Sequence, residues 1–273
     1  MRRTCCRPEA GRGKLYTSMS LFNSPSQYRE KAAIWRLFSE LPLYAPLAAG
    51  HVWRWFAVNI PMDLGTGGGE FTRDIDILAR LHDFPRSQDW LYKTWEVKVS
   101  LLCKDGSARS LKTGKLNRTV SQLKGYKKFG SPSVSLLDVY VCQEGYMGGN
   151  IFPPDKLANS ISGKIAELRP RGFGYQLLPF EPSRVGIGMF RIPTEWNPLR
   201  NTFDLLPATT HGPEQPFSRL ADRLCGFFEQ AQERRGKSFN QIVYCRDCRR
   251  LQLIRMRDEH VCPDCNADLI SQF

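Results

Sequence analysis

Glu96 and Lys98 stand two residues apart in the segment TWEVKVS, residues 94–100, in which polar and apolar side chains alternate. In a strand, this period of two places Glu96 and Lys98 on one face and Trp95 and Val97 on the other. If this strand lay in an antiparallel sheet with one solvent-exposed face, the two charged side chains would need no chemical role. The alternative is that a carboxylate and an ammonium act together in a site on this face.

Two aspartates show the same spacing upstream, in RDIDIL, residues 73–78. We expect a short strand with Asp74 and Asp76 on one face and the isoleucines on the other. Pairing with the next strand would bring Asp76 close to Glu96 and Lys98. Such carboxylates can hold Mg²⁺, which neutralises a scissile phosphate and acidifies a bound water. The lysine could orient that water or stabilise developing negative charge, so the pattern suits phosphodiester hydrolysis.

These residues resemble a known family of nucleases. Asp76 followed by Ile-Leu, then Glu96-Val-Lys98 on an apolar strand, resembles the PD-(D/E)XK nuclease superfamily, and Gln122-Leu-Lys-Gly-Tyr126 resembles the Gln-x-x-x-Tyr helix motif of its RecB-like branch. The resemblance implies that Gln122 approaches the metal site and that Tyr126 lies near the nucleic-acid backbone. It also implies a restriction-endonuclease-like core. Judged from spacing alone, the last two residues could equally form a helical packing face.

The acidic residues leave further alternatives open. No proline precedes the acid, which departs from the family pattern, and Asp74 competes with Asp76 for the metal role. Asp74 could instead form a surface ion pair with Arg73 or Arg80. Glu70, which follows a run of glycines, is a further candidate ligand.

The charge of the chain favours a polyanionic partner. Its 39 Lys and Arg residues exceed its 27 Asp and Glu residues, giving a formal net charge of +12. Nucleic acid is the first candidate and an anionic membrane surface the second. Between residues 107 and 130 the chain has basic residues and no acidic one, and we expect Lys124, Lys127 and Lys128 there to bind a phosphate backbone.

No membrane or secretory segment is expected. The chain has no apolar run long enough to span a bilayer, and its basic N-terminal segment lacks the apolar stretch of a secretory signal. We therefore expect an intracellular, cytoplasmic protein whose nine cysteines do not form a disulfide framework.

Four cysteines have the spacing of a metal site. Cys245, Cys248, Cys262 and Cys265 form two Cys-x-x-Cys pairs, the arrangement of a zinc ribbon. Four thiolates close the site to water, so we expect a structural Zn²⁺, with His260 as a surface residue. The basic and apolar segment between the pairs could grip nucleic acid or a partner protein, or could simply complete the fold.

The periodicity predicts an α/β fold: a restriction-endonuclease-like mixed central sheet flanked by helices, plus a small zinc-ribbon module. The predicted helices cover residues 26–41, 45–59, 118–130, 153–169 and 216–236, and the predicted strands cover residues 73–81, 94–100, 134–142 and 172–180. The expected domains are a flexible basic arm (1–24), a nuclease-like core with an irregular proline-rich extension (25–215), a connecting helix (216–240) and the zinc ribbon (241–273).

These observations predict a metal-dependent nuclease. Asp76 and Glu96 would bind Mg²⁺ or Mn²⁺, Lys98 and Gln122 would complete the site, and DNA would be the substrate ahead of RNA, in phage defence or mobile-element processing. The alternative is a catalytically inactive, nuclease-like zinc-ribbon adaptor that binds nucleic acid or a protein. The presence of Asp76, Glu96 and Lys98 together favours the enzyme.

Overall fold

The computed structural model describes residues 52–67, 71–82, 90–110, 116–142, 153–180, 204–235, 241–255 and 261–272 of the 273-residue chain. The predicted basic arm and first helix lie outside these residues, as do Glu70 and His260. The strands are β1 (Val52–Pro61), β2 (Asp74–His82), β3 (Trp90–Leu102), β4 (Ala108–Ser110), β5 (Val134–Cys142), β6 (Gly174–Phe180), β7 (Asp204–Leu206), β8 (Gln241–Cys245) and β9 (Arg250–Ile254). The helices are α4 (Asp63–Thr66), α5 (Leu116–Lys128), α6 (Asp155–Leu168) and α7 (Gln215–Arg235), with short 3₁₀ turns η2 (Arg169–Arg171) and η3 (Ile270–Gln272).

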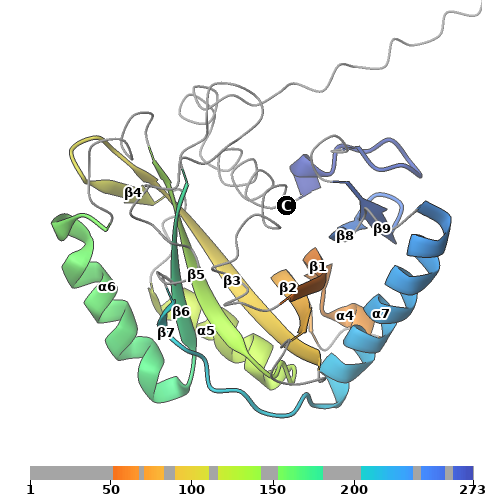
Figure 1. The fold of residues 1–273 in the computed structure, drawn as a ribbon, viewed down its shortest axis with the longest axis horizontal. Helices are drawn as coiled ribbons and strands as arrows, with labels where there is room; N and C mark the ends of the chain where they lie inside the picture. Colours follow the sequence, from red (N-terminus) through yellow and green to blue (C-terminus); the bar gives the residue numbers. More distant parts are fainter. Residues whose placement is uncertain are drawn as a thin grey trace, which may run out of the picture.

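One mixed sheet of nine strands organises the described residues (Figure 1). Its order is β7-β6-β5-β3-β2-β1-β8-β9, and β4 pairs with β3 to the side. The pairs β3–β5, β5–β6 and β1–β8 are parallel, whereas β1–β2, β2–β3, β6–β7 and β8–β9 are antiparallel. The predicted α/β class with a mixed sheet and flanking helices is therefore confirmed.

Helices α5, α6 and α7 pack against one face of this sheet (Figure 1). Val120, Ile161 and Phe217, one from each helix, share a buried cluster with Leu136 of β5. Trp95 belongs to a second cluster on the opposite face, together with Val97 and Val99 of the same strand. The alternation predicted for β3 is thus present, and Glu96 and Lys98 lie on the helix-covered face.

Strand β1 corrects the predicted helix over residues 45–59. Residues 52–61 form a strand in which Trp55 and Ala57 join one core cluster and Phe56 and Val58 join the other. Because both faces are buried, the sequence shows no polar alternation, and its apolar spacing imitates a helix. The aromatic and β-branched residues of the segment suit a strand better.

Smaller differences concern three short strands and the cysteine module. β4 forms where no strand was predicted, β7 lies in the proline-rich extension expected to be irregular, and β8 continues the main sheet by pairing with β1 at Phe56–Val58. The predicted end of α5 at Gly130 is confirmed, since Gly130 has a φ of 89° and a side chain there would collide with Glu214. None of the helices in the described ranges is long and apolar enough to cross a membrane.

Candidate active site and metal centre

The acidic cluster begins where the β2–β3 ladder stops. The last paired residues are Ile77 and Trp95, so Asp76 and Glu96 come next on their strands. Asp76 Oδ2 accepts a hydrogen bond from the backbone N–H of Val97 at 2.8 Å. A side chain thus bonds the backbone of the next strand beyond the end of the ladder, which places the Asp76 carboxylate beside Glu96, as the sequence predicts.

Glu96 is a buried carboxylate with two partners. Its side chain is 1% exposed; Oε1 accepts a hydrogen bond from Lys98 Nζ at 2.5 Å, and Oε2 accepts one from the Tyr126 hydroxyl at 2.7 Å. Lys98 Nζ also donates to Gln122 Oε1 at 3.3 Å. The predicted residues Glu96, Lys98 and Gln122 are therefore in contact, and the ammonium compensates the desolvation of the carboxylate.

Tyr126 joins β2 to β3 from inside the protein. Its hydroxyl lies 3.0 Å from the carbonyl oxygen of Asp74 and accepts a long contact of 3.4 Å from the N–H of Asp76, besides donating to Glu96. Burial, together with the charges of Asp76 and Glu96, raises the pKa of Tyr126 well above its usual value, so the phenol stays protonated. The sequence predicts that Tyr126 lies near a nucleic-acid backbone; the side chain is instead 1% exposed and bound to Glu96.

Asp74 is turned toward the cysteine module. Its carboxylate forms a close ion pair with Arg246, not with Arg73 or Arg80 as the sequence suggests. Burial raises the pKa of Asp74, and the guanidinium of Arg246 opposes that rise.

The two isoleucines of β2 do not share one face, contrary to what the sequence predicts, since Ile75 belongs to the helix-side core and Ile77 to the opposite one. The strand is irregular here, opposite a residue of β1 (Asn59) with a φ of 52°.

The acidic cluster contains two side chains with hard oxygen donors, Asp76 and Glu96. Asp76 and Glu96 offer two carboxylates, which is the number that Mg²⁺ commonly takes from a protein beside water and phosphate oxygens. Lys98 already neutralises Glu96 at Oε1, so a cation there would share that oxygen with the ammonium or displace it. Among the described residues, only the four cysteines form a group of three or more ligating side chains close enough to share one ion.

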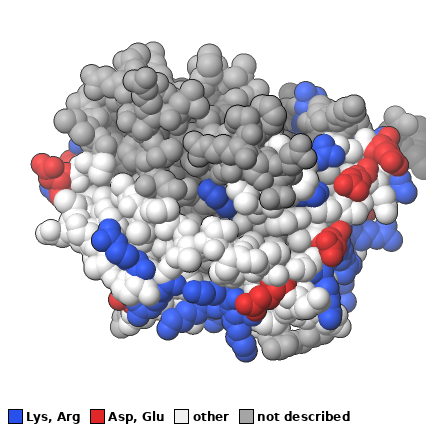
Figure 2. Space-filling model, turned by 60° about the horizontal axis from the view of Figure 1, so that its bottom comes forward, with Lys and Arg blue, Asp and Glu red and all other residues white. Residues whose placement is uncertain are grey.

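The lysines of α5 lie on the outside of the molecule. Lys124, Lys127 and Lys128 are exposed, Lys127 Nζ donates to the carbonyl oxygen of Arg171 at 3.3 Å, and Lys128 lies over the ring of Phe71. Figure 2, which brings the bottom of Figure 1 forward, shows Lys and Arg side chains in a band across the lower part of this face. Three exposed lysines therefore lie on the helix that also supplies Gln122, and their contact with nucleic acid stays a prediction.

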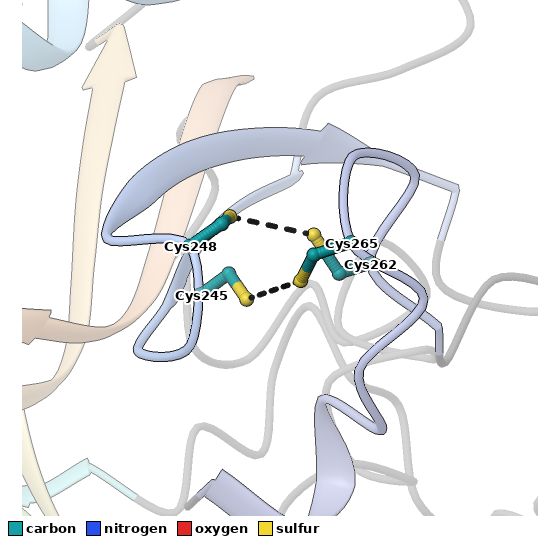
Figure 3. A group of neighbouring side chains, drawn as sticks. All are labelled: Cys245, Cys248, Cys262 and Cys265. Atoms are coloured by element: carbon teal, nitrogen blue, oxygen red, sulfur yellow. Dashed lines mark hydrogen bonds between the residues drawn. The ribbon is translucent and has the colours of Figure 1, made fainter.

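The four cysteine sulfur atoms converge on one point (Figure 3). All four lie within 4.8 Å of one another, with 3.6 Å between Sγ of Cys245 and Cys265 and 3.7 Å between Sγ of Cys248 and Cys262. Four Zn–S bonds of about 2.3 Å would give sulfur separations of about 3.8 Å in a tetrahedron. The cluster could therefore hold zinc, and its edges are far too long for disulfides, which need about 2.05 Å.

The two Cys-x-x-Cys turns have matching backbones. The N–H of Cys248 donates to the Cys245 sulfur, and the N–H groups of Asp264 and Cys265 donate to the Cys262 sulfur. The residue after each pair is left-handed: Arg249 has a φ of 56° and Asn266 a φ of 60°. Burial raises the pKa of the Cys262 thiol to about 12, and a cation bound there would displace its proton.

Sequence reasoning missed a second ion pair on the same face of the sheet. Asp138 is the Cα partner of Lys98 in the β3–β5 ladder, and its carboxylate forms a close ion pair with Lys164 of α6. The Tyr175 hydroxyl donates to the same carboxylate at 2.7 Å. Two buried carboxylates, each bound by a lysine and a tyrosine, therefore lie on neighbouring strands. The available signal was one acidic residue in the otherwise uncharged run of residues 134–142.

No family model, curated protein or solved structure matches this chain. The case for a function therefore rests on the residues of the acidic cluster, on the cysteine cluster and on the sheet that positions them.

Proposed function

We propose that this protein is a metal-dependent nuclease that hydrolyses phosphodiester bonds in nucleic acid. The observation that carries the proposal is the single cluster formed by Asp76 of β2, Glu96 and Lys98 of β3, and Gln122 of α5. These are the residues through which the sequence resembles PD-(D/E)XK nucleases. If Glu96 and Lys98 formed only a surface ion pair, neither Asp76 nor Gln122 would be needed beside them.

Each residue has a role in this proposal. A cation held by Asp76 and Glu96 would supply charge neutralisation at the scissile phosphate and activation of a water molecule. Lys98 is partly exposed, at 27% of its side chain, and would donate to the phosphate or to the attacking water. Gln122 fixes the direction of the Lys98 ammonium. Tyr126 holds Glu96 in place from the buried side, since its protonated hydroxyl can only donate to that carboxylate.

The order of the elements supports a restriction-endonuclease-like core within this proposal. The antiparallel strands β1, β2 and β3 are followed by the short β4, by α5 and by β5, which pairs in parallel with β3. The two carboxylates of the cluster come from β2 and β3, and α5 supplies the glutamine. This order supports the mixed, helix-flanked core that the resemblance implies.

The basic face of α5 supports nucleic acid as the substrate, and we propose DNA ahead of RNA. Lys124, Lys127 and Lys128 lie on the same helix as Gln122, so a phosphate backbone along the helix would pass close to the acidic cluster. We propose a structural Zn²⁺ in the cysteine cluster, where four thiolates would leave no open position for chemistry. Phage defence and mobile-element processing are the processes we propose for such an enzyme.

The direct experiment incubates the purified chain with plasmid, single-stranded DNA and RNA in Mg²⁺, in Mn²⁺ and in EDTA. We expect cleavage with either cation and none in EDTA, and we expect Asp76→Asn to lose it. Binding of nucleic acid without cleavage under every condition would instead support the inactive adaptor. Asp155→Asn, at the exposed start of α6, is the matched control for removal of one carboxylate.

A further inference from the structure

The cysteine module reaches the acidic strand through one side chain. Arg246 lies inside the first Cys-x-x-Cys turn, and its guanidinium pairs closely with the carboxylate of Asp74. The same Nη2 lies 3.4 Å from Oδ1 of Asn59, the left-handed residue of β1. Arg246 therefore binds Asp74, which lies 172 positions away in the chain and two residues before Asp76.

Arg246 is itself held by the module. Its backbone N–H donates to Gln272 Oε1 at 2.7 Å, and the Asn59 side-chain amide donates to the carbonyl oxygen of Gln272 at 3.1 Å. Gln272 Nε2 also lies 3.8 Å from the Cys245 sulfur. The sulfur cluster, the Arg246 side chain and the bend in β1 thus form one connected set of contacts.

On the other side, the backbone of Asp74 contacts the acidic cluster through Tyr126. Its carbonyl oxygen lies 3.0 Å from the Tyr126 hydroxyl that donates to Glu96. The N–H of Asp76 contacts the same hydroxyl, and the Asp76 carboxylate holds the Val97 N–H. A displacement of Asp74 would therefore move Asp76 relative to Glu96.

We propose that Arg246 is a positioning residue through which a filled cysteine site holds Asp76 in place for cation binding. The inference rests on the proposed function as far as that cation is concerned. A metal in the four-thiolate site fixes the turn that carries Arg246, and Arg246 fixes Asp74. Loss of the metal from the cysteine site then weakens the affinity of Asp76 and Glu96 for a divalent cation, although both carboxylates are still present.

The test compares wild type, Arg246→Ala, Arg246→Lys and Arg250→Ala in three measurements. These are zinc content, Mn²⁺ affinity from the electron paramagnetic resonance signal of free Mn²⁺, and the hydrogen-exchange rate of the Val97 amide without added Mn²⁺. The Val97 amide reports on the Asp76 carboxylate, which accepts its hydrogen bond. Arg250 is the matched control, since it lies in the same hairpin and pairs with Asp264.

We expect Arg246→Ala to keep its zinc while its Mn²⁺ affinity falls and its Val97 exchange accelerates by about two- to fivefold each, the size suited to one half-exposed ion pair. Arg246→Lys should recover part of both losses, and Arg250→Ala should show neither. Unchanged exchange at Val97 in zinc-loaded Arg246→Ala would overturn the inference. If the wild type binds no Mn²⁺, the proposed function fails at that point, and Val97 exchange alone still decides whether Arg246 positions Asp76.

Discussion

Replacing Lys98 with methionine should make the stability of the protein depend on a divalent cation. The change keeps the length of the side chain but removes the ammonium 2.5 Å from Glu96 Oε1, leaving a carboxylate that is 1% exposed. Breaking a buried pair from one side costs about 3–5 kcal/mol. Because Lys98 is 27% exposed and Tyr126 still donates to Glu96, we expect the free energy of unfolding in EDTA to fall by about 2–3 kcal/mol.

Mn²⁺ should restore much of this loss, because it can replace the ammonium at Glu96. A cation at a hundredfold excess over its Kd stabilises the folded state by about 2.7 kcal/mol. In the wild type the ammonium competes for the same oxygen, so we expect Lys98→Met to bind Mn²⁺ about tenfold more tightly, a difference of about 1.4 kcal/mol. Cleavage should nevertheless be lost. The assay is urea unfolding with EDTA and with a series of Mn²⁺ concentrations.

Lys164→Met provides the matched control. It makes the same change in the Asp138 pair, whose side chains are 23% and 5% exposed. We expect a comparable fall in the free energy of unfolding without recovery in Mn²⁺. The reason is that a cation site needs a second carboxylate, and we expect one, Asp76, beside Glu96 and none beside Asp138. Equal recovery of both variants, or recovery of neither, would refute the assignment of Glu96 as a metal ligand.

Three further predictions test other parts of the structure. Tyr126→Phe should lower the free energy of unfolding by about 1.5–3 kcal/mol, the range for a hydrogen bond to a charged group. Tyr244→Phe is the control, because the Tyr244 hydroxyl makes no hydrogen bond among the described residues, and it should change this free energy by less than about 0.5 kcal/mol. Equal effects of the two substitutions in urea titrations would contradict the role of the Tyr126 hydroxyl. Alanine at the three α5 lysines should reduce the slope of log affinity against log salt for duplex DNA by about 2 to 3, and an equal reduction after alanine substitution of three exposed α7 arginines would mean that α5 is not the binding face. Those control residues are Arg219, Arg223 and Arg234. Cys248→Ser should abolish zinc binding in elemental analysis and accelerate hydrogen exchange in β8 and in the β1 segment paired with it; unchanged zinc content would remove the metal from this account.

Short apolar runs could be predicted from the sequence, and the longer apolar segment that contains β1 was misassigned. The strand over residues 134–142 and the helix that ends before Gly130 agree with their predicted positions because apolar runs and glycine report directly on local structure. Strand β1 was misassigned because burial of both faces removes the polar alternation, and the apolar segment over residues 45–59, unlike the nine-residue run of β5, is long enough to form a helix.

In the candidate site, contacts between adjacent strands could be predicted from the sequence, and contacts set by the tertiary fold could not. The proximity of Asp76 to Glu96 and Lys98 follows from pairing two adjacent strands, so the sequence predicts it. The hydrogen bond from Tyr126 to Glu96 depends on how α5 docks on the sheet, and periodicity gives only the face of the helix. The Arg246–Asp74 pair joins segments that become neighbours only after β8 pairs with β1, which no local pattern reports.

Glu96 is proposed to serve phosphodiester hydrolysis together with a divalent cation. The most direct test is a single-turnover time course on an end-labelled DNA, with wild type and Glu96→Gln at saturating protein, in Mg²⁺ and in EDTA. We predict cleavage by the wild type in Mg²⁺ alone, and a rate at least about a hundredfold lower for Glu96→Gln with DNA affinity retained, because the carboxylate acts on the transition state. Cleavage by Glu96→Gln at the wild-type rate, or wild-type cleavage that persists in EDTA, would contradict the account.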